Sequence, residues 1–483
     1  MKKLTMASRL KKSVSAAIVL MMLTPFSAFA ADANATSSSA DQVKEILDML
    51  QQNHVSAPSA DNLSTAAIKG MVDSLKDPYT VYFTKNEWQQ FTDSLEQNYV
   101  GIGVRVGEDK DGILIVQVFG GSSAEAAGIK RGDIITKVEG AATAGKKLDD
   151  VISTILGTAG TEVNLTIKRG DSSFDVKTTR KQVQIPVVTS HMFANGVGYI
   201  NVSSFSAEAD ELFASNLDTL KQQGLKTLLI DLRNNPGGLL DSALNISKLF
   251  IKEGVLIHTK DRDNVDDPVL IQGGATQPFP VVMLVDEYSA SASEVLTGAL
   301  QDYNHVKVVG TKTFGKGSVQ SVYPLANGGA LKVTIEEYLT PNMRKVNKVG
   351  LTPDIESQGE VPQLITALRT AGLTSFTLEQ NRRNTSLNSY ELNDSFNIVS
   401  QNGRTYIPSR VLAALVGADV SWNEADKSVV VAAGDISAAF STAESGDSLN
   451  QEGTSFIDVS KFADTFKQLK WSQDGGVLKL SVQ

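Results

Sequence analysis

A serine-rich turn is the first segment of this sequence that could carry out hydrolytic chemistry. The apolar run Val281–Val285 precedes Asp286-Glu287-Tyr288, and Ser289-Ala290-Ser291-Ala292-Ser293-Glu294 follows. Small residues let the backbone turn sharply from strand to helix and present a hydroxyl at the tip. The helix N-terminus then offers unpaired N–H groups to a developing oxyanion. The same pattern is also typical of a simple helix cap closed by a serine and a glutamate.

A serine nucleophile needs a base, and Lys316 is the best candidate. It lies in Thr313-Phe314-Gly315-Lys316-Gly317, after the apolar strand predicted at Val306–Val309. Glycines on both sides allow close backbone approach and shield the ammonium from water, which lowers the pKa of a lysine toward that of a general base. If the segment is extended, Lys316, Ser318 and Gln320 share one face, and Gln320 could orient the amine. The alternative is a Gly-Lys-Gly surface turn.

A third candidate segment, Asp231-Leu232-Arg233-Asn234-Asn235-Pro236-Gly237-Gly238, follows the apolar strand predicted at Thr227–Leu232. A Pro-Gly-Gly tip at the carboxyl end of a buried strand can present the Gly238 N–H to an oxyanion. By itself it also fits an ordinary strand-to-helix loop. Apolar strands alternate with helical stretches throughout this region, which predicts a largely parallel, buried sheet. All three segments would then lie at strand ends of one sheet.

Composition excludes several other kinds of site. The 483 residues include no Cys and only four scattered His, so disulfides, thiolate metal sites and a cysteine nucleophile are excluded, and no metal or cofactor is expected. The acidic stretch 261–267 departs from the calcium-loop pattern, because Asp266 stands where the turn glycine belongs. A net charge of −9 without a basic stripe argues against nucleic acid as a partner.

Residues 1–30 have the pattern of a bacterial-type signal peptide. Five basic residues precede an apolar run at 14–23, and Ala28-Phe29-Ala30 forms a small-x-small cleavage site. The apolar run is shorter than the roughly 20 residues that span a bilayer, and an uncleaved anchor is the alternative. The protein is therefore expected to be exported, either secreted or associated with the cell envelope. Loss of the five basic residues would change the net charge from −9 to −14.

Periodicity and composition divide the chain into regions. The last region repeats a β-α-β-β pattern, in which Gly403-Arg404-Thr405-Tyr406-Ile407 is matched by Gly453-Thr454-Ser455-Phe456-Ile457. The regions are a signal peptide at 1–30, a helical region at 31–97, a compact β module at 98–181, an α/β core at 182–372, a polar linker at 373–389 and the repeat region at 390–483.

The three candidate segments together resemble the carboxy-terminal processing peptidases, or tail-specific proteases, over about residues 41–371. In that family the serine lies in a Ser-Ala-Ser-Glu context, and the lysine of Thr-Phe-Gly-Lys-Gly follows 25 residues later, which selects Ser291 and Lys316. The family's glutamine matches Gln320. The resemblance implies an oxyanion hole formed by the N–H groups of Gly238 and Ala292. It also implies a multidomain α/β fold with a ClpP/crotonase-like core, and serine endopeptidase activity without a cofactor.

The module at 98–181 is similar to a PDZ domain. The sequence Val100-Gly101-Ile102-Gly103-Val104 matches the loop whose backbone N–H groups bind a terminal carboxylate, and residues 124–140 match the helix-turn-strand run that accompanies it. PDZ domains bind an extended peptide at a sheet edge, with an apolar pocket for its last side chain. The resemblance therefore implies protein substrates with apolar C-termini, in protein processing or quality control.

The two ends of the chain carry further resemblances. The helical residues 41–97 correspond to a segment that pairs subunits in some family members, so a homodimer through these helices is one expectation. The repeat region resembles the copper amine oxidase N-terminal-like domain. Residues 376–483 lack His, Cys and Met, so copper has no soft or imidazole ligand there. We interpret the region as an attachment or partner-binding module, for cell-wall material, with a purely stabilising appendage as the alternative.

Two other functions compete with a Ser/Lys peptidase. A PDZ adaptor with an inactive catalytic domain would usually lose one of the residues corresponding to Ser291, Lys316 and Gln320, and all three are present. A chymotrypsin-like exported protease needs a His/Asp/Ser order and a Gly-rich serine motif, and the sequence has neither. Whether the site is assembled at rest or only after a substrate tail binds is open at this point.

Overall fold

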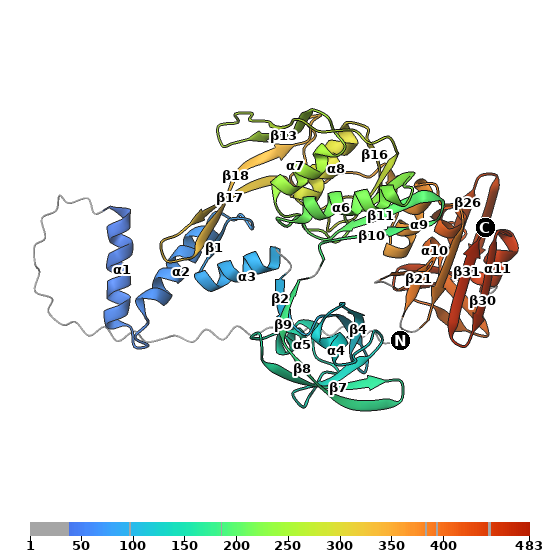
Figure 1. Ribbon diagram of the computed structural model, residues 1–483, viewed down its shortest axis with the longest axis horizontal. Coiled ribbons are helices and arrows are strands. Elements are labelled where there is room, and N and C mark those ends of the chain that lie inside the picture. Colours follow the sequence, from blue (N-terminus) through green and yellow to red (C-terminus); the bar gives the residue numbers. More distant parts are fainter. Residues whose placement is uncertain (1–37, 96–97, 185, 382–383, 393–394, 443–445) are drawn as a thin grey trace, which may run out of the picture. The chain divides into compact units, whose positions relative to one another are not determined.

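The computed structural model describes residues 38–95, 98–184, 186–381, 384–392, 395–442 and 446–483 (Figure 1). The signal peptide predicted at 1–30 lies outside these ranges. The chain divides into two compact units, residues 1–70 and 71–483, and each is described by itself. Every helix within the described ranges is too short or too polar to span a bilayer.

The first unit is helical, as its apolar spacing predicts. Helix α1 (Ser39–Asn53) begins after Ser38, whose hydroxyl accepts a hydrogen bond from the Asp41 N–H, and helix α2 (Ala60–Asp73) follows. Helix α1 buries none of its residues, and the exposed side chains include Val43, Ile46, Met49 and Leu50. An amphipathic helix with an unburied apolar face is typical of an association surface.

A six-stranded sheet forms the core of the second unit, in the order β10-β11-β12-β15-β16-β19. Neighbouring strands are parallel except for β10, which is antiparallel to β11. The bounds are β10 (Val188–Met192), β11 (Val197–Val202), β12 (Thr227–Asp231), β15 (Val281–Val285), β16 (Val306–Gly310) and β19 (Ile355–Glu356). The parallel sheet predicted from the apolar runs is therefore present, and the three candidate segments follow β12, β15 and β16 at its carboxyl edge.

Helices cover both faces of this sheet, which explains why its central strands are apolar at successive positions. Leu228 and Ile230 of β12 belong to a hydrophobic core that includes residues of α6, α7 and α8, whereas Leu229 between them belongs to a core that includes residues of α9. Figure 1 shows α6, α7 and α8 near one another. The helices are α6 (Ala209–Gln222), α7 (Leu240–Lys248), α8 (Ala292–Asp302) and α9 (Glu360–Thr370).

A second sheet carries the residues that follow Lys316. Strand β18 is antiparallel to β17, β13 and β1, and β14 pairs with β13. The bounds are β1 (Val81–Phe83), β13 (Gly254–Lys260), β14 (Val269–Ile271), β17 (Ser318–Pro324) and β18 (Ala330–Leu339). Strand β1 corrects the prediction of an entirely helical region at 31–97, because Val-Tyr-Phe favours a strand once β18 offers it a partner. Helix α3 (Lys85–Leu95) follows.

The module predicted at 98–181 forms a sheet in the order β3-β4-β5-β7-β8, with β6 beside β5 and a separate pair β2–β9. Strand β3 is at the end of this sheet, so one of its edges is open among the described residues. The bounds are β2 (Asn98–Gly101), β3 (Val104–Asp109), β4 (Gly112–Val118), α4 (Ser123–Ala126), β5 (Ile134–Val138), β6 (Ala141–Ala142), α5 (Leu148–Ile155), β7 (Glu162–Arg169), β8 (Ser172–Thr179) and β9 (Lys181–Gln184).

The C-terminal region contains the predicted β-α-β-β unit twice, and the first strands of the two copies pair with Ile407 opposite Ile457. The first copy is β24 (Arg404–Pro408), α10 (Ser409–Val416), β25 (Asp419–Asn423) and β26 (Ser428–Ala433). The second copy is β29 (Thr454–Asp458), α11 (Val459–Thr465), β30 (Leu469–Asp474) and β31 (Val477–Val482). Further strands are β22 (Tyr390–Leu392), β23 (Val399–Gln401), β27 (Ile436–Ser441) and β28 (Ser448–Gln451).

The polar linker predicted at 373–389 is wrong. Strands β20 (Phe376–Gln380) and β21 (Thr385–Leu387) occupy part of it, and β20 pairs with β31, the last strand of the chain. Leu373, Leu378 and Leu387 are buried among the polar residues. In the sequence, apolar residues alternate with polar ones over too short a stretch to predict strands in a segment of polar composition.

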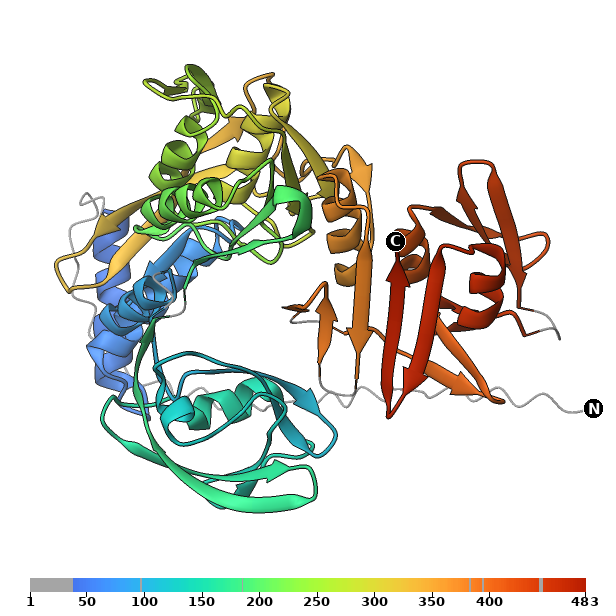
Figure 2. The same ribbon diagram turned by 45° about the vertical axis from the view of Figure 1, so that its right-hand side comes forward.

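The C-terminal region and the α/β core share one hydrophobic cluster. Leu364 and Leu368 of α9 belong to the same buried cluster as Leu284 of β15 and as Leu412 and Leu415 of α10. Figure 2 shows α9 beside the C-terminal strands. Helix α9 is therefore buried between the sheet and the C-terminal region.

Candidate active site

Ser291 lies at a strained turn between β15 and α8. Its backbone has φ 55° and ψ −116°, a combination that residues with side chains rarely adopt and that clusters at functional turns. The neighbouring serines are buried and have structural roles, because Ser289 Oγ donates to the Leu232 carbonyl at 2.9 Å and Ser293 Oγ donates to the Asn235 carbonyl at 2.9 Å. Ser291 is partly exposed, so of the three serines it is the one that substrate can reach.

Hydrogen bonds hold the loop after β12 against this turn. The Asn235 carbonyl accepts one from the Ala290 N–H at 3.0 Å, and the Asp286 carboxylate accepts one from the Asn234 N–H at 3.0 Å. The Asp286 carboxylate also accepts one from the Ser289 N–H at 2.9 Å. Burial raises the pKa of Asp286, against the effect of the hydrogen bonds that it accepts. The two segments therefore form one rigid unit.

Gly237 brings that loop into contact with Ser291. A Cβ atom on Gly237 would lie 2.7 Å from the Ala290 carbonyl oxygen, 2.8 Å from Ser291 Cβ and 2.9 Å from the Ala292 nitrogen. The φ angles of 104° at Gly237 and 145° at Gly238 also require glycine. The structure thus brings Gly237 and the Ala292 N–H to the same serine, while Gly238, the next residue, lies against the Phe205 backbone. The Ala292 N–H lies in the first turn of α8, where N–H groups lack intrahelical acceptors.

Glu294 connects the serine turn to the lysine turn. Its side chain is fully buried, and its carboxylate accepts hydrogen bonds from the N–H groups of Ser291 (3.0 Å), Gly315 (2.7 Å) and Lys316 (2.8 Å) and from the Thr313 hydroxyl (2.6 Å). Burial raises the pKa of Glu294, although all four hydrogen bonds oppose this increase. Because all four partners donate, the ionised carboxylate is the form that fits this environment.

The Lys316 side chain is engaged with an aromatic ring. Its Nζ atom lies 5.1 Å from the centroid of the Tyr79 ring, on the segment that precedes β1. Among the described residues, Nζ forms no hydrogen bond with Ser291 Oγ. The structure therefore links the backbones of the predicted nucleophile and base through Glu294, but their side chains are not hydrogen-bonded to each other.

The electrostatic environment of Lys316 favours its neutral form. Burial lowers the pKa of Lys316, and the cation of Lys332 lowers it further, while Glu294 and Asp77 act in the opposite direction. Desolvation penalises the charged amine, and a neutral amine near neutral pH is what a general base requires. The direction agrees with the role predicted for Lys316.

Gln320 lies in β17, at an irregular step in the pairing of β17 with β18. Its Nε2 atom donates to Ser318 Oγ at 2.9 Å and to Thr334 Oγ1 at 3.3 Å. Ser318 and Gln320 therefore share a face, as predicted, but within the described residues the Gln320 amide makes no hydrogen bond with Lys316.

The predicted carboxylate loop, residues 100–104, joins β2 to β3. The Ile102 carbonyl accepts a hydrogen bond from the Ala124 N–H at 2.9 Å, and the Gly103 carbonyl accepts one from the Phe119 N–H at 3.0 Å. A trans peptide holds its C=O and N–H in opposite directions, so the N–H groups that follow these two carbonyls point away from the module's interior. Such outward N–H groups can bind a carboxylate.

The end of α5 lies beside this loop. A Cβ atom on Gly101 would be 3.1 Å from Leu156 Cδ2, and the Gly157 N–H donates to the Val100 carbonyl at 3.4 Å. Leu156 is 37% exposed. An apolar, partly exposed side chain thus flanks the loop that leads into β3.

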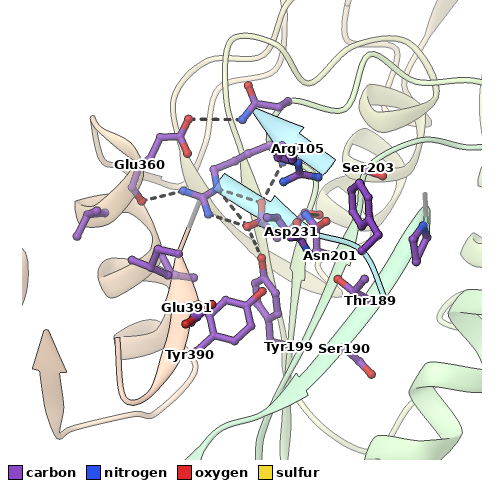
Figure 3. A pocket seen from close by; sticks show the side chains of 18 of the residues that line it. Arg105, Thr189, Ser190, Tyr199, Asn201, Ser203, Asp231, Glu360, Tyr390 and Glu391 are labelled. Atoms are coloured by element: carbon purple, nitrogen blue, oxygen red, sulfur yellow. Dashed lines mark hydrogen bonds and ion pairs between the residues drawn. The ribbon is translucent and has the colours of Figure 1, made fainter. Parts of the chain in front are cut away.

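A cavity of about 950 Å³ in the second unit is lined by other residues than Ser291 and Lys316 (Figure 3). In it the buried Asp231 carboxylate accepts hydrogen bonds from the Tyr199 hydroxyl at 2.8 Å and from Arg233 Nη2 at 2.7 Å. Arg233 Nη1 donates to the Glu360 carbonyl at 2.8 Å. This network connects the start of the 231–238 segment to α9, which gives it a supporting role.

Sequence reasoning missed several residues that hold the site. In the sequence, Asp77-Pro78 predicts only a break between two helices, and no motif connects Tyr79, Lys332 or Asp286 with the site. The structure also pairs His258 Nδ1 with Asp266 at 2.9 Å, which the sequence analysis did not identify. A single sequence has no signal for contacts between such distant segments.

Four family descriptions match the chain. Peptidase family S41 matches residues 196–357, and the PDZ domain matches residues 100–179. The activating protease CtpB N-terminal domain matches residues 21–87, and the copper amine oxidase N-terminal domain matches residues 386–464. The first two matches include the candidate active-site and carboxylate-loop residues, respectively.

Curated relatives are similar over the same part of the chain. A "Probable CtpA-like serine protease" of Staphylococcus aureus is 37% identical over 318 residues, which are 65% of this chain and 64% of the relative. Its counterpart in Staphylococcus epidermidis is 35% identical over 317 residues, with the same coverage. The chain thus spans less than two thirds of the length of these relatives.

Among solved structures, a photosystem II D1 C-terminal processing protease is 26% identical and covers 70% of this chain and 98% of its own, with a TM-score of 0.43. The family matches and the relatives confirm the resemblance found in the sequence, and the multidomain α/β fold is confirmed as well. Residues 196–357 therefore match peptidase family S41 and residues 100–179 match a PDZ domain, a combination similar to that of the carboxy-terminal processing peptidases.

Proposed function

We propose that the chain is an exported serine endopeptidase that captures substrate C-termini through its PDZ domain and cleaves peptide bonds with Ser291, Lys316 and Gln320. The observation that carries the proposal is the buried Glu294 carboxylate, which accepts hydrogen bonds from the backbones of both Ser291 and Lys316. Burial of an ionised carboxylate is unfavourable unless hydrogen bonds compensate for the lost water, so the hydrogen bonds that Glu294 accepts support an assembled site. Protein processing and quality control both fit this activity.

The proposed reaction uses these groups in order. The neutral Lys316 amine takes the proton of Ser291 Oγ, which attacks the peptide carbonyl carbon. The N–H groups of Gly238 and Ala292 stabilise the oxyanion of the tetrahedral intermediate. Lys316 then gives the proton to the leaving amine, and water, deprotonated by Lys316, hydrolyses the acyl-enzyme and restores Ser291. No metal or cofactor takes part.

The described arrangement corresponds, in this proposal, to a resting state. Lys316 must leave the Tyr79 ring to reach Ser291. Gln320 must likewise turn from Ser318 and Thr334 toward the amine. Glu294 already holds the Lys316 backbone in place, so in this proposal the amine moves by rotation of the Lys316 side chain.

Substrate capture is assigned to residues 100–104 and to the open edge of β3. The outward N–H groups of the loop would bind the terminal carboxylate, Leu156 would contact the last side chain, and the peptide would add to β3 as a further strand. Substrates with apolar C-termini fit this arrangement. The 1–30 leader supports export, the exposed apolar face of α1 supports a homodimer, and the C-terminal repeat would attach to cell-wall material.

The test uses the chain without its leader, residues 31–483, as wild type and as Ser291→Ala and Lys316→Ala. Each protein is incubated with a loosely folded substrate that ends in an apolar tail, and with the same substrate capped by Asp-Asp. We expect cleavage by the wild type alone, and weaker cleavage of the capped substrate. If all three proteins bind the tail and none cleaves it, even with higher substrate concentrations, an adaptor, or a gated peptidase that awaits an activator, replaces the proposed peptidase.

A further inference from the structure

Lys316 shares its surroundings with a second partly buried lysine. Lys332 lies on β18, between β1 and β17. Its Nζ atom is 4.7 Å from the ring centroid of Phe91 and 5.7 Å from that of Phe83. In the described part of the chain, Lys332 forms no salt bridge, so its charge is held by two aromatic faces.

Strand register places this lysine on the face that carries Gln320. Residues opposite one another in antiparallel strands share a face, and so do residues i and i+2 of one strand. Gln320 is opposite Thr334, and Thr334 is two residues after Lys332. Lys332 is also opposite Val81 of β1, and Tyr79, whose ring Lys316 contacts, comes two residues before Val81, so the two lysines belong to the same neighbourhood.

The charged groups around the two lysines have opposing effects. Asp77 precedes β1 and favours the cations of both lysines, and Glu294 of α8 favours that of Lys316. Burial would raise the pKa of Asp77, but hydrogen bonds from Thr80, Thr334 and the backbone outweigh burial and lower it, so Asp77 is ionised. Burial lowers the pKa of both lysines, and the like charge of the neighbouring lysine adds to this effect at Lys316.

From this geometry we infer that Lys332 is a positioning residue for the proposed reaction, which acts by remaining protonated on the Phe83 and Phe91 rings and so favouring the neutral, proton-accepting form of Lys316. A neighbouring positive charge disfavours the protonated form of a lysine, and contact with aromatic rings stabilises it. The lysine that contacts two aromatic rings, Lys332, therefore keeps its proton. The inference rests on the proposed function, because it assigns Lys332 a role only if Lys316 is the base.

The first test is the pH dependence of kcat/KM, which reports the essential base of the free enzyme. We expect Lys332→Met to move the acidic limb to higher pH, with a rate about tenfold lower on that limb and recovered at alkaline pH. Lys332→Arg keeps the charge and should leave the limb in place, as should the control Lys307→Met at an exposed position of β16. Uniform loss at every pH, or equal shifts in both Lys332 variants, would show a structural role and overturn the inference.

A second test reads the Lys316 proton without catalysis. In the Ser291→Ala background, the lysines are labelled competitively with acetic anhydride across the same pH range, and mass spectrometry follows the peptide that contains Lys316. We expect the labelling midpoint of Lys316 to move to higher pH in Lys332→Met and to stay in place in Lys332→Arg. An unmoved midpoint in Lys332→Met overturns the inference. If the labelling midpoint moves in Lys332→Met but the wild-type protein cleaves no substrate, the proposed function has failed. The interaction between the two lysines would still be supported.

Discussion

Glu294 Oε2 accepts hydrogen bonds from both the Ser291 N–H, at 3.0 Å, and the Lys316 N–H, at 2.8 Å. One buried oxygen therefore fixes the main chain of the proposed nucleophile and of the proposed base. The Lys316 side chain is not fixed by it and extends to Tyr79. The main chain of Lys316 is therefore fixed next to that of Ser291, whereas the Lys316 amine can change position.

The first prediction concerns Glu294→Gln. Glutamine has nearly the same size, but its NH₂ group would face backbone N–H donors that now share a carboxylate. We expect the free energy of unfolding to fall by about 1–3 kcal/mol and kcat to fall much more than KM rises. Urea unfolding and steady-state kinetics measure the two effects. Full activity in a folded variant would show that the carboxylate does not align the site.

The second prediction compares two glycines. In Gly237→Ala the new methyl group would lie 2.8 Å from Ser291 Cβ, and we expect cleavage to fall by about 100-fold, because a displacement near 1 Å at the reacting groups costs about that much. Gly224→Ala is the matched control, since its φ is also positive but no atom lies within 4 Å of the new Cβ. It should lose about 1 kcal/mol of stability and keep its activity. Equal activities of the two variants would contradict the prediction.

The sequence predicts the parts of the site that depend on local pattern. The strands ending at Asp231 and Val285 are apolar runs, and the resemblance to the carboxy-terminal processing peptidases, with its 25-residue spacing, selects Ser291 and Lys316 among several serines and lysines. The contact of Lys316 with Tyr79 depends on β1 pairing with β18, and the sequence does not specify such a long-range pairing. The linker error has the same origin, because Phe376 is recognised as a core residue only when β31 lies beside it.

The third prediction follows from the lowered pKa of Lys316. The unfolded chain binds the proton more tightly than the folded chain, so Lys316 reduces stability below the unfolded pKa, and this cost disappears as pH rises through the ordinary lysine value of 10.5. Lys316→Met should therefore be more stable than wild type at pH 7, with a difference that shrinks toward pH 10.5. Denaturant unfolding at several pH values measures the difference, and Lys307→Met, at an exposed position of β16, is the control for loss of one positive charge. A difference independent of pH would contradict the assignment.

The fourth prediction concerns the terminal carboxylate of the substrate. A peptide with a free apolar C-terminus should bind the Ser291→Ala protein about 10–100-fold more tightly than its C-terminal amide, since hydrogen bonds to a charged group contribute about 1.5–3 kcal/mol. Gly103→Ala should remove this preference, because its Cβ would lie 2.3 Å from Ser122 Cβ. Gly121→Ala, with a positive φ and open space, is its control. Calorimetry that shows equal affinity for acid and amide would place the binding site elsewhere.

The last prediction tests whether the C-terminal region is an appendage or part of the catalytic unit. Leu412 of α10 is fully buried in the cluster that also contains Leu364 of α9 and Leu284 of β15. We expect Leu412→Ala to cost about 2–5 kcal/mol and to lower the unfolding transition of the α/β core together with that of the C-terminal region, because α9 depends on both. The exposed Ile436→Ala should change stability by less than about 0.5 kcal/mol. If Leu412→Ala unfolds the C-terminal region alone and cleavage persists at that temperature, the shared cluster does not couple the two parts, and the peptidase domain would fold without residues 373–483.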